Sequence, residues 1–386
     1  MSTAVDHQRT AVANASQPSS AAAPRNTHQH VPFSTRLRAR LARLIRSEFW
    51  PRTVFYAPLV PVLLALAARH RSFTVFTAAN THPAFPLGGF VGESKHAILK
   101  DLPPDLTAPS TLVPPGPLDH RLNAILQHIE ANAWSFPVVL KPDVGERGSA
   151  VKLIRTVEHA RAALIACPDA LLLQRFSPGP FEAGIFFVRT PDHPQGDIFS
   201  ITDKVFPILQ GDGRSTLPSL IWSHPRFRMQ ARTFLARHER HLDTIIPAGQ
   251  SFPLAFAGNH CQGTLFRSGD HLRSDALLES IRRAASALPG FNFGRFDIRY
   301  RSPEELRQGT AFEIVELNGV LSESTDIYDP RSTLLSAYRT LIRQWRTAFT
   351  IGAHNRASGA AVPTLRHLIS VARAHTQRAT VDQLSD

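Results

Sequence analysis

Arg295, Asp297 and Arg299 are charged residues at alternate positions, separated by apolar residues. Successive side chains of a β-strand point to opposite faces, so this spacing predicts a strand with one polar and one apolar face. The apolar face suits a core. The charged face is where chemistry could take place.

A second segment, 312–319, carries Glu316 and Asn318 two positions apart, so both would project from one face of a strand. A hairpin would bring them beside Asp297. Carboxylate and amide oxygens are hard ligands, suited to one or two Mg²⁺ ions that also bind phosphate oxygens. By strict alternation Glu313 lies on the opposite face, so we expect that it is not a ligand. The alternative for the whole group is a polar face on an exposed hairpin.

A third candidate is the loop that follows the apolar residues 136–140. It begins with Lys141 and contains Gly145, Gly148 and Ser149. A glycine-bearing loop lets backbone N–H groups approach phosphate oxygens, while a lysine neutralises their charge. Many such loops are plain hairpin turns.

The composition narrows the class of protein. The chain has 386 residues, of which 43% are hydrophobic and 19% charged, so it can bury a large core. Two distant cysteines, Cys167 and Cys261, exclude a disulfide framework or a CxxC site, and the 18 histidines show no zinc-binding spacing. The net charge of +12 suits anionic partners, but no nucleic-acid-binding motif accompanies it. Only five of the 43 basic residues are lysine, so each lysine is unusual.

The elements around these motifs are expected to be mixed helices and strands. The patterns predict strands at 73–78, 138–141, 151–154, 171–174, 184–189 and 198–206, a linker at 103–117, a helix at 274–288 with Ser274 as N-cap, a hairpin over 293–317, and a helix opened by Asp329 and Pro330. Strands and helices follow one another here without the strict strand–helix–strand alternation of α/β proteins, which favours an α+β fold.

Residues 33–50 predict a basic amphipathic helix, with leucines on one face and arginines on the others. The apolar stretch 53–68 is shorter than the ~20 residues of a membrane-spanning helix and contains Pro58 and Pro61. We expect the stretch 53–68 to form a buried helix. Otherwise, we expect it to attach the protein peripherally to the cytoplasmic face of a membrane, together with the basic helix. In the alternative, 53–68 is a core helix covered by the leucine face.

Taken together, the ordered motifs resemble the ATP-grasp superfamily, in particular carboxylate–amine ligases such as D-alanine–D-alanine ligase, cyanophycin-synthetase-like enzymes and glutathione-synthesising enzymes. The segments that carry the resemblance are 136–151, 172–182, 203–204, 211–217, 294–297 and 316–318. The resemblance implies two α+β subdomains that sandwich a nucleotide, here with an extra N-terminal helical segment.

The resemblance also implies roles for individual residues. ATP would be bound by Lys95, Lys141, Gly145, Gly148, Ser149, Gln174, Phe176, Glu182 and Lys204, with its adenine near the 174–176 hinge and its ribose near Glu182. Asp297, Glu316 and Asn318 would hold Mg²⁺, and Arg295 together with Lys141 would stabilise the transferring phosphoryl group. Candidates for contacting the substrate are His260, Arg267, Ser322, Ser324 and Tyr328.

The implied reaction joins a small-molecule carboxylate to an amine through an acyl phosphate. Two alternatives stay open: a non-catalytic nucleotide-binding protein that associates with a membrane or partner through residues 33–68, and a phosphotransferase of the same fold. The expected layout is a disordered tail (1–32), the helical segment (33–71), an N-terminal α/β segment with linker (72–118), the ATP-grasp domain (119–350), and a C-terminal helix and tail (351–386). No secretory signal is expected, so the setting would be cytoplasmic.

Overall fold

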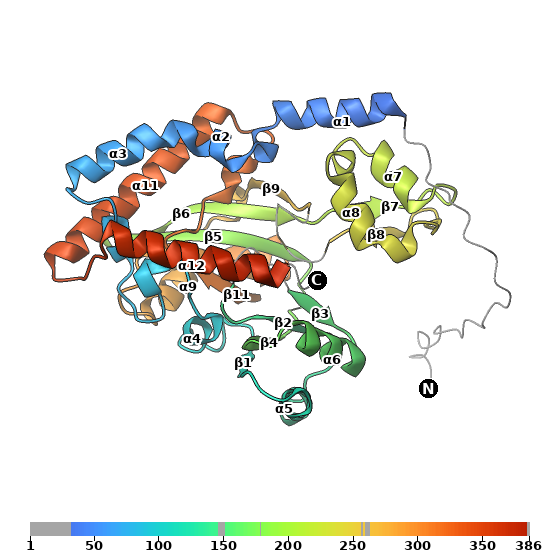
Figure 1. The fold of residues 1–386 in the computed structure, drawn as a ribbon, viewed down its shortest axis with the longest axis horizontal. Helices are drawn as coiled ribbons and strands as arrows, with labels where there is room; N and C mark the ends of the chain where they lie inside the picture. Colours follow the sequence, from blue (N-terminus) through green and yellow to red (C-terminus); the bar gives the residue numbers. More distant parts are fainter. Residues whose placement is uncertain (1–31, 146–150, 178, 256–257, 259–262, 384–386) are drawn as a thin grey trace, which may run out of the picture.

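A five-stranded antiparallel sheet forms the centre of the molecule (Figure 1). The computed structural model describes residues 32–145, 151–177, 179–255, 258 and 263–383. The strand order is β11 (Phe312–Asn318), β10 (Phe293–Tyr300), β5 (Phe181–Thr190), β6 (His193–Val205) and β9 (Leu265–Ser268). The prediction of an α+β fold is confirmed.

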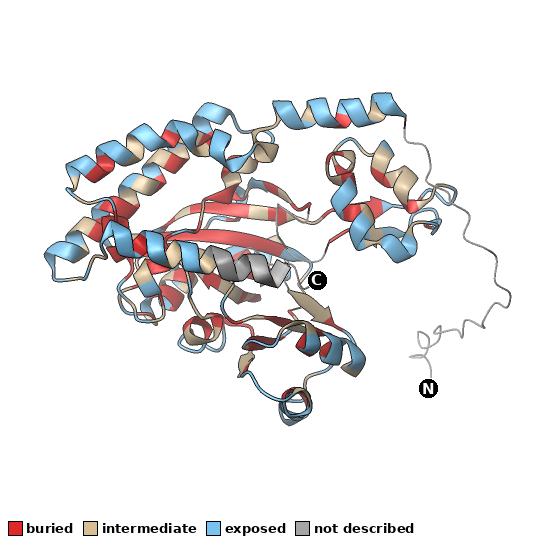
Figure 2. Cartoon of the chain, in the orientation of Figure 1, coloured by how far each residue is buried: buried red, intermediate tan, exposed pale blue. Residues whose placement is uncertain are grey.

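Both faces of this sheet are covered, which explains the continuous apolar run in β5. Phe187 packs in a core with α9 (Asp275–Ser286), whereas its neighbour Phe186 packs on the other face with α11 (Leu334–Ala357). The central strands are accordingly buried along most of their length (Figure 2). Two-sided burial requires apolar residues at successive positions rather than at alternate ones.

A second antiparallel sheet has the strand order β1 (Ser110–Val113), β4 (Leu171–Arg175), β2 (Val138–Pro142) and β3 (Lys152–Ile154). Helices α5 (Leu118–Ala131) and α6 (Val157–Ala166) cover one face, where Val138, Leu140 and Leu173 are buried. The alternation of side chains turns Lys141 to the other face. The face of the second sheet that carries Lys141 is directed toward the first sheet.

A small lobe follows β6. It consists of β7 (Ile208–Gln210) paired with β8 (Ser251–Pro253), helices α7 (Leu217–Ser223) and α8 (Ala231–Arg237), and the 3₁₀ turns Phe227–Gln230 and Glu239–His241, around its own core. Short elements connect the larger ones: α4 (Lys95–Leu99), α10 (Pro303–Arg307), and 3₁₀ turns at Pro86–Gly88, Asp270–Leu272 and Thr325–Tyr328. The last helix is α12 (Leu365–Gln383).

The amino-terminal part is helical, as predicted. It consists of α1 (Phe33–Ile45), a turn at Ser47–Phe49, α2 (Arg52–Tyr56), a turn at Ala57–Leu59, and α3 (Val60–Arg69). Phe55 and Leu59 are buried against α11, so the apolar stretch has a core-facing side. The leucine face of α1 does not cover it, because Leu37, Leu41 and Leu44 are exposed. The covered-core-helix alternative is therefore wrong in that respect.

Several predicted elements match the structure. The strands at 138–141 and 171–174 and the hairpin over 293–317 are present, and the Ser274 hydroxyl caps α9 by accepting from the Leu277 amide at 3.1 Å. Others differ. Residues 73–78 form no strand but lead into a 3₁₀ turn, Val75–Ala79, that packs on α11 and is buried at every position, Thr77 included.

The expected linker at 103–117 contains β1, which pairs with β4, so the second sheet begins before residue 119. Helix α11 begins at Leu334 rather than at Pro330, with Thr333 as its N-cap, and it continues past residue 350. Asp329 does not cap it because its carboxylate accepts hydrogen bonds from the Ser268 amide (2.8 Å) and from Arg331.

Candidate active site

A cavity of about 1370 Å³ opens between the two sheets. Its lining comes from both sheets, the small lobe, α1, α2 and the loop that precedes α4. Sites that bury one small ligand have volumes of roughly 300–1,000 Å³. This cavity is large enough for a nucleotide and a second substrate.

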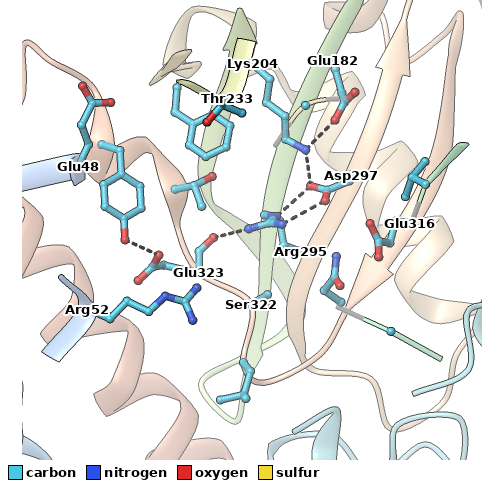
Figure 3. Close-up of a pocket in the computed structure, with 18 of the residues that line it drawn as sticks. Glu48, Arg52, Glu182, Lys204, Thr233, Arg295, Asp297, Glu316, Ser322 and Glu323 are labelled. Carbon is cyan, nitrogen blue, oxygen red and sulfur yellow. Dashed lines mark hydrogen bonds and ion pairs between the residues drawn. The ribbon is translucent and has the colours of Figure 1, made fainter. Parts of the chain in front are cut away.

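Strands β10 and β11 form one wall of the cavity. In their register Asp297 lies opposite Glu316, and Arg295 lies opposite Asn318. Figure 3 shows Asp297 and Glu316 on neighbouring strands, facing the same side. The predicted convergence of the three oxygen-bearing residues is therefore present, and all three line the cavity.

Asp297 is the centre of a charge cluster. Arg295 donates to both of its oxygens, at 2.9 and 3.1 Å, and Lys204 Nζ lies 3.1 Å from Oδ1 (Figure 3). Burial by itself would raise the pKa of Asp297, but Arg295 and Lys204 outweigh it and hold that pKa below its usual value. Asp297 is thus an anion at neutral pH.

The floor beneath this cluster is Gly184 on β5. A Cβ atom there would lie 3.0 Å from Arg295 Cδ and 3.2 Å from Asp297 Oδ1. These distances are shorter than ordinary van der Waals contact, so a larger residue would displace the pair. The absence of a side chain at position 184 lets the guanidinium lie flat against the strand.

Glu316 differs from Asp297 because its carboxylate has no hydrogen bond or ion pair within the part of the chain that the structure describes. It is half-buried and faces the cavity. A carboxylate in this position is open to a cation that enters with a ligand.

Lys141 is the penultimate residue of β2 and lines the same cavity. Its ammonium donates to Gln174 Oε1 (3.0 Å) and to the Val315 carbonyl (2.9 Å). Burial lowers the pKa of Lys141 to about 8. A phosphate would reverse this shift, because a nearby negative charge favours the ammonium form.

Two more lysines line the cavity. Burial would lower the pKa of Lys204, but Asp297 and Glu182 outweigh it and raise that pKa; Glu182 Oε1 accepts from Lys204 at 2.8 Å. Lys95 Nζ donates to the Gly145 carbonyl at 2.7 Å and so fastens the base of the glycine loop. Three of the five lysines of the chain therefore line this one cavity.

The expected adenine hinge, 174–176, also lines the cavity. Gln174 is buried, and the Phe176 ring is covered by the Arg299 guanidinium at 5.2 Å. Gly145 is at the cavity as predicted, while Gly148, Ser149 and His260 lie outside the described residues. The structure brings Ser322 and Tyr328 to the cavity, whereas Arg267 and Ser324 are not among its lining residues.

The position of Glu313 corrects the expectation for that residue. A β-bulge makes Val315 an extra residue in β11, so Glu313 pairs with Arg299 and lies on the same face as Glu316. It does not line the cavity, however, and its carboxylate is ion-paired with Arg175. That Glu313 is not a metal ligand stays a prediction, now resting on this ion pair rather than on alternation.

Sequence reasoning missed the far end of the cavity. There α2 contributes Arg52 and Tyr56, the loop after β11 contributes Glu323, and the small lobe contributes Arg228 and Arg232. No local pattern signals these residues, because they come from distant segments: Tyr56 and Glu323, which are hydrogen-bonded, are 267 positions apart.

The residues present fit Mg²⁺. Two carboxylates and one amide oxygen are hard donors, and a Mg²⁺ ion completes its octahedral shell with water and phosphate oxygens. Among the described residues there is no group of three or more His, Cys, Asp or Glu that would form an all-protein metal cage. The three donors would leave the other coordination positions of a Mg²⁺ ion to water or ligand oxygens.

Comparisons with known proteins found no matching family model and no curated protein with significant similarity. Among solved structures, the chain is similar to a bifunctional glutathione synthetase from Pasteurella multocida (13% identity, TM-score 0.33), of which it covers 34% while 62% of this chain is matched. It is also similar to a D-alanine–D-alanine ligase from Bacillus anthracis (11% identity, TM-score 0.37, 69% of each chain) and to the ATP-grasp ligase PsnB (14% identity, TM-score 0.33, 65% of this chain and 59% of that one).

The sequence motifs predicted a resemblance to ATP-grasp ligases, and these similar structures include a protein described as an ATP-grasp ligase. At 11–14% identity and TM-scores of 0.33–0.37, the similarity assigns no activity to this chain. The chemistry follows from this chain's own residues.

Proposed function

We propose that this protein is an ATP-dependent ligase that joins a carboxylate to an amine, with Mg²⁺-ATP bound in the cavity between the sheets. The observation that carries the proposal is the convergence of three rare lysines with Asp297, Glu316 and Asn318 on one cavity. Lysines suit phosphate oxygens and the acidic residues suit Mg²⁺, so the two groups together favour a triphosphate.

The reaction requires two steps. A carboxylate oxygen attacks the γ-phosphorus of ATP while the bond from that phosphorus to the β,γ-bridging oxygen breaks, which yields an acyl phosphate and ADP. The amine nitrogen then attacks the acyl carbon, inorganic phosphate leaves, and the nitrogen loses a proton. Phosphorylation turns a poor leaving group into a good one.

The residues of the chain have distinct parts in these steps. Lys95 and Lys141 would neutralise phosphate oxygens, and Arg295, fixed by Asp297, would stabilise charge on the phosphoryl group during transfer. Asp297, Glu316 and Asn318 would hold Mg²⁺, which supplies charge neutralisation at the phosphates when bound. Gln174 and Phe176 would position the base.

A hydroxylamine trap tests the proposal. The protein is incubated with Mg²⁺-ATP, hydroxylamine and a panel of amino acids, dicarboxylic acids and short peptides, and both ADP and hydroxamate are measured. We expect a carboxylate that releases both products in equal amounts, because hydroxylamine captures acyl phosphates. ADP release with a hydroxyl acceptor and no hydroxamate would instead identify a phosphotransferase. Absence of both products across the panel would contradict catalysis.

A further inference from the structure

The cavity continues past Arg295 to a carboxylate that the steps above do not use. Glu323 lies between β11 and the turn Thr325–Tyr328, and its side chain points toward α2 (Figure 3). The Tyr56 hydroxyl donates to Oε1, and the Tyr328 hydroxyl donates to Oε2 at 3.0 Å. The two hydroxyl oxygens are 3.2 Å apart. Glu323 is therefore fixed in one position by two neutral donors.

Glu323 differs in its pairing from three other acidic residues of the cavity, Glu182, Asp297 and Glu48, which are ion-paired. Lys204 pairs with Glu182 and Asp297, and Arg226 pairs with Glu48 at 3.0 Å. Within the described residues Glu323 has no ion pair, although the chain has 43 basic residues. Arg52 and Arg295 act on this half-buried carboxylate without forming an ion pair, and a carboxylate withdrawn from water without a paired cation is costly unless a ligand supplies one.

Its position is next to the reacting groups. Arg295 Nη1 donates to the backbone carbonyl of Glu323 at 3.0 Å, and the same guanidinium holds Asp297. A group bound by Glu323 would therefore lie on the side of Arg295 opposite the metal-binding carboxylates (Figure 3). Burial raises the pKa of Glu323, which a bound cation would reverse.

We propose that Glu323, held by Tyr56 and Tyr328, binds the ammonium group of a primary-amine substrate. The inference rests on the proposed function, which requires an amine. The inference adds to that function the residue that recognises the amine. An ammonium group offers three donors, which matches the lone pairs that the two tyrosines leave open on the carboxylate.

Thermal shifts with matched probes test this proposal. The protein is saturated with Mg²⁺ and a non-hydrolysable ATP analogue, and each amine is compared with a neutral probe of similar shape: ethanolamine with ethylene glycol, putrescine with 1,4-butanediol, alaninamide with lactamide. We expect at least one amine, and none of the neutral probes, to raise the melting temperature. In Glu323→Gln the affinity for that amine should fall about 10- to 100-fold.

Glu304→Gln is the matched control, because it makes the same change on an exposed residue of α10 and should bind the amine like the unchanged protein. Tyr56→Phe keeps the carboxylate and removes one donor, so its affinity should be intermediate. Equal amine shifts in Glu323→Gln and the unchanged protein, or no amine shift at all, would overturn the proposal. Failure to bind the nucleotide analogue would count against the proposed function instead.

An independent observation concerns the outer surface of the amino-terminal helices. Helices α1 and α3 lie along one edge of the molecule (Figure 1), and many of their residues are exposed (Figure 2), apolar ones among them. On α1 these include Phe33, Leu44 and Ile45, exposed by 77%, 68% and 83%, and on α3 Val60 and Leu64, exposed by 50% and 53%. We call these residues the apolar edge.

Basic residues accompany the apolar edge. Arg38, Arg69 and Arg71 are exposed; Arg36 and Arg40 are exposed too, at the mouth of the cavity that they line. The span Arg52–Arg69 is long and apolar enough to cross a membrane, but it packs against α11 and contains two prolines. These features favour a segment that lies on a membrane rather than one that spans it.

We propose that the apolar edge docks on an anionic phospholipid surface, because exposed apolar residues flanked by arginines match acyl chains and anionic headgroups. Co-sedimentation with vesicles of phosphatidylcholine and phosphatidylglycerol tests it, with phosphatidylcholine alone for comparison. We expect binding to the anionic vesicles that weakens at high salt and falls at least about tenfold when Phe33, Leu44 and Ile45 become Ser.

Ile165→Ser is the control, since Ile165 is 66% exposed on α6, outside the apolar edge. It should bind as the unchanged protein does. Absence of binding to anionic vesicles, or equal binding by the triple variant, would overturn the proposal.

Discussion

Glu316→Gln should reduce carboxylate-dependent ADP formation by roughly a thousandfold or more, because a metal ligand contributes several kcal/mol of charge stabilisation to phosphoryl transfer. The substitution keeps the shape of the side chain and removes its charge. No ion pair is lost, since none is found for Glu316 among the described residues. The measurement is the initial rate of ADP release with the carboxylate identified in the hydroxamate screen.

The matched control is Glu313→Gln on the same strand. Glu313 lies on the same face as Glu316 but is paired with Arg175 and does not line the cavity. It should keep most of the activity, with a loss within about tenfold. Equal losses in the two variants would mean that the assigned metal face is wrong.

Lys141→Met should weaken Mg²⁺-ATP binding about 10- to 100-fold, because a charged hydrogen bond to phosphate is lost from a buried position. The pKa of Lys141 in the nucleotide-free protein is about 8. Phosphate favours its protonated form, so nucleotide binding should take up a proton above that pH. Affinity should therefore fall as the pH rises from about 8 to 9.5.

Calorimetric titration in two buffers of different ionisation enthalpy measures both effects. In the unchanged protein, the apparent binding enthalpy at pH 8.5 should depend on the buffer. In Lys141→Met that dependence should be smaller. A variant with wild-type affinity and the same proton uptake would show that Lys141 does not contact the phosphates.

Much of the cavity wall that β10 and β11 form could be predicted, because it depends on local patterns. The alternation of apolar and charged residues along β10 identified its two faces correctly. Phe296 and Ile298 are buried in the core, and Asp297 lines the cavity. Alternation failed for Glu313, because one extra residue in β11 reverses the faces and leaves no mark in the sequence. Residues 73–78 form no strand, and the 3₁₀ turn Val75–Ala79 is buried at every position, so no period in its residues distinguishes it from a strand.

The far end of the cavity could not be predicted from local patterns. Glu323 and Tyr56 meet only because α2 packs against α11, which brings the amino-terminal segment over the active site. The sequence indicated an amphipathic α1, but not that Arg36 and Arg40 would line the cavity while the leucines stayed exposed. Both outcomes depend on tertiary packing. The helical periodicity of a sequence predicts an amphipathic helix but not what each face of that helix contacts.

The most direct test of the central claim is the thermal stability of the unchanged protein with Mg²⁺-ATP. If the lysines and carboxylates of the cavity bind this ligand, a concentration of a hundred times the dissociation constant should raise the free energy of unfolding by about 2.7 kcal/mol. The rise should shrink when Mg²⁺ is removed with a chelator. No change in stability at millimolar Mg²⁺-ATP would contradict the account.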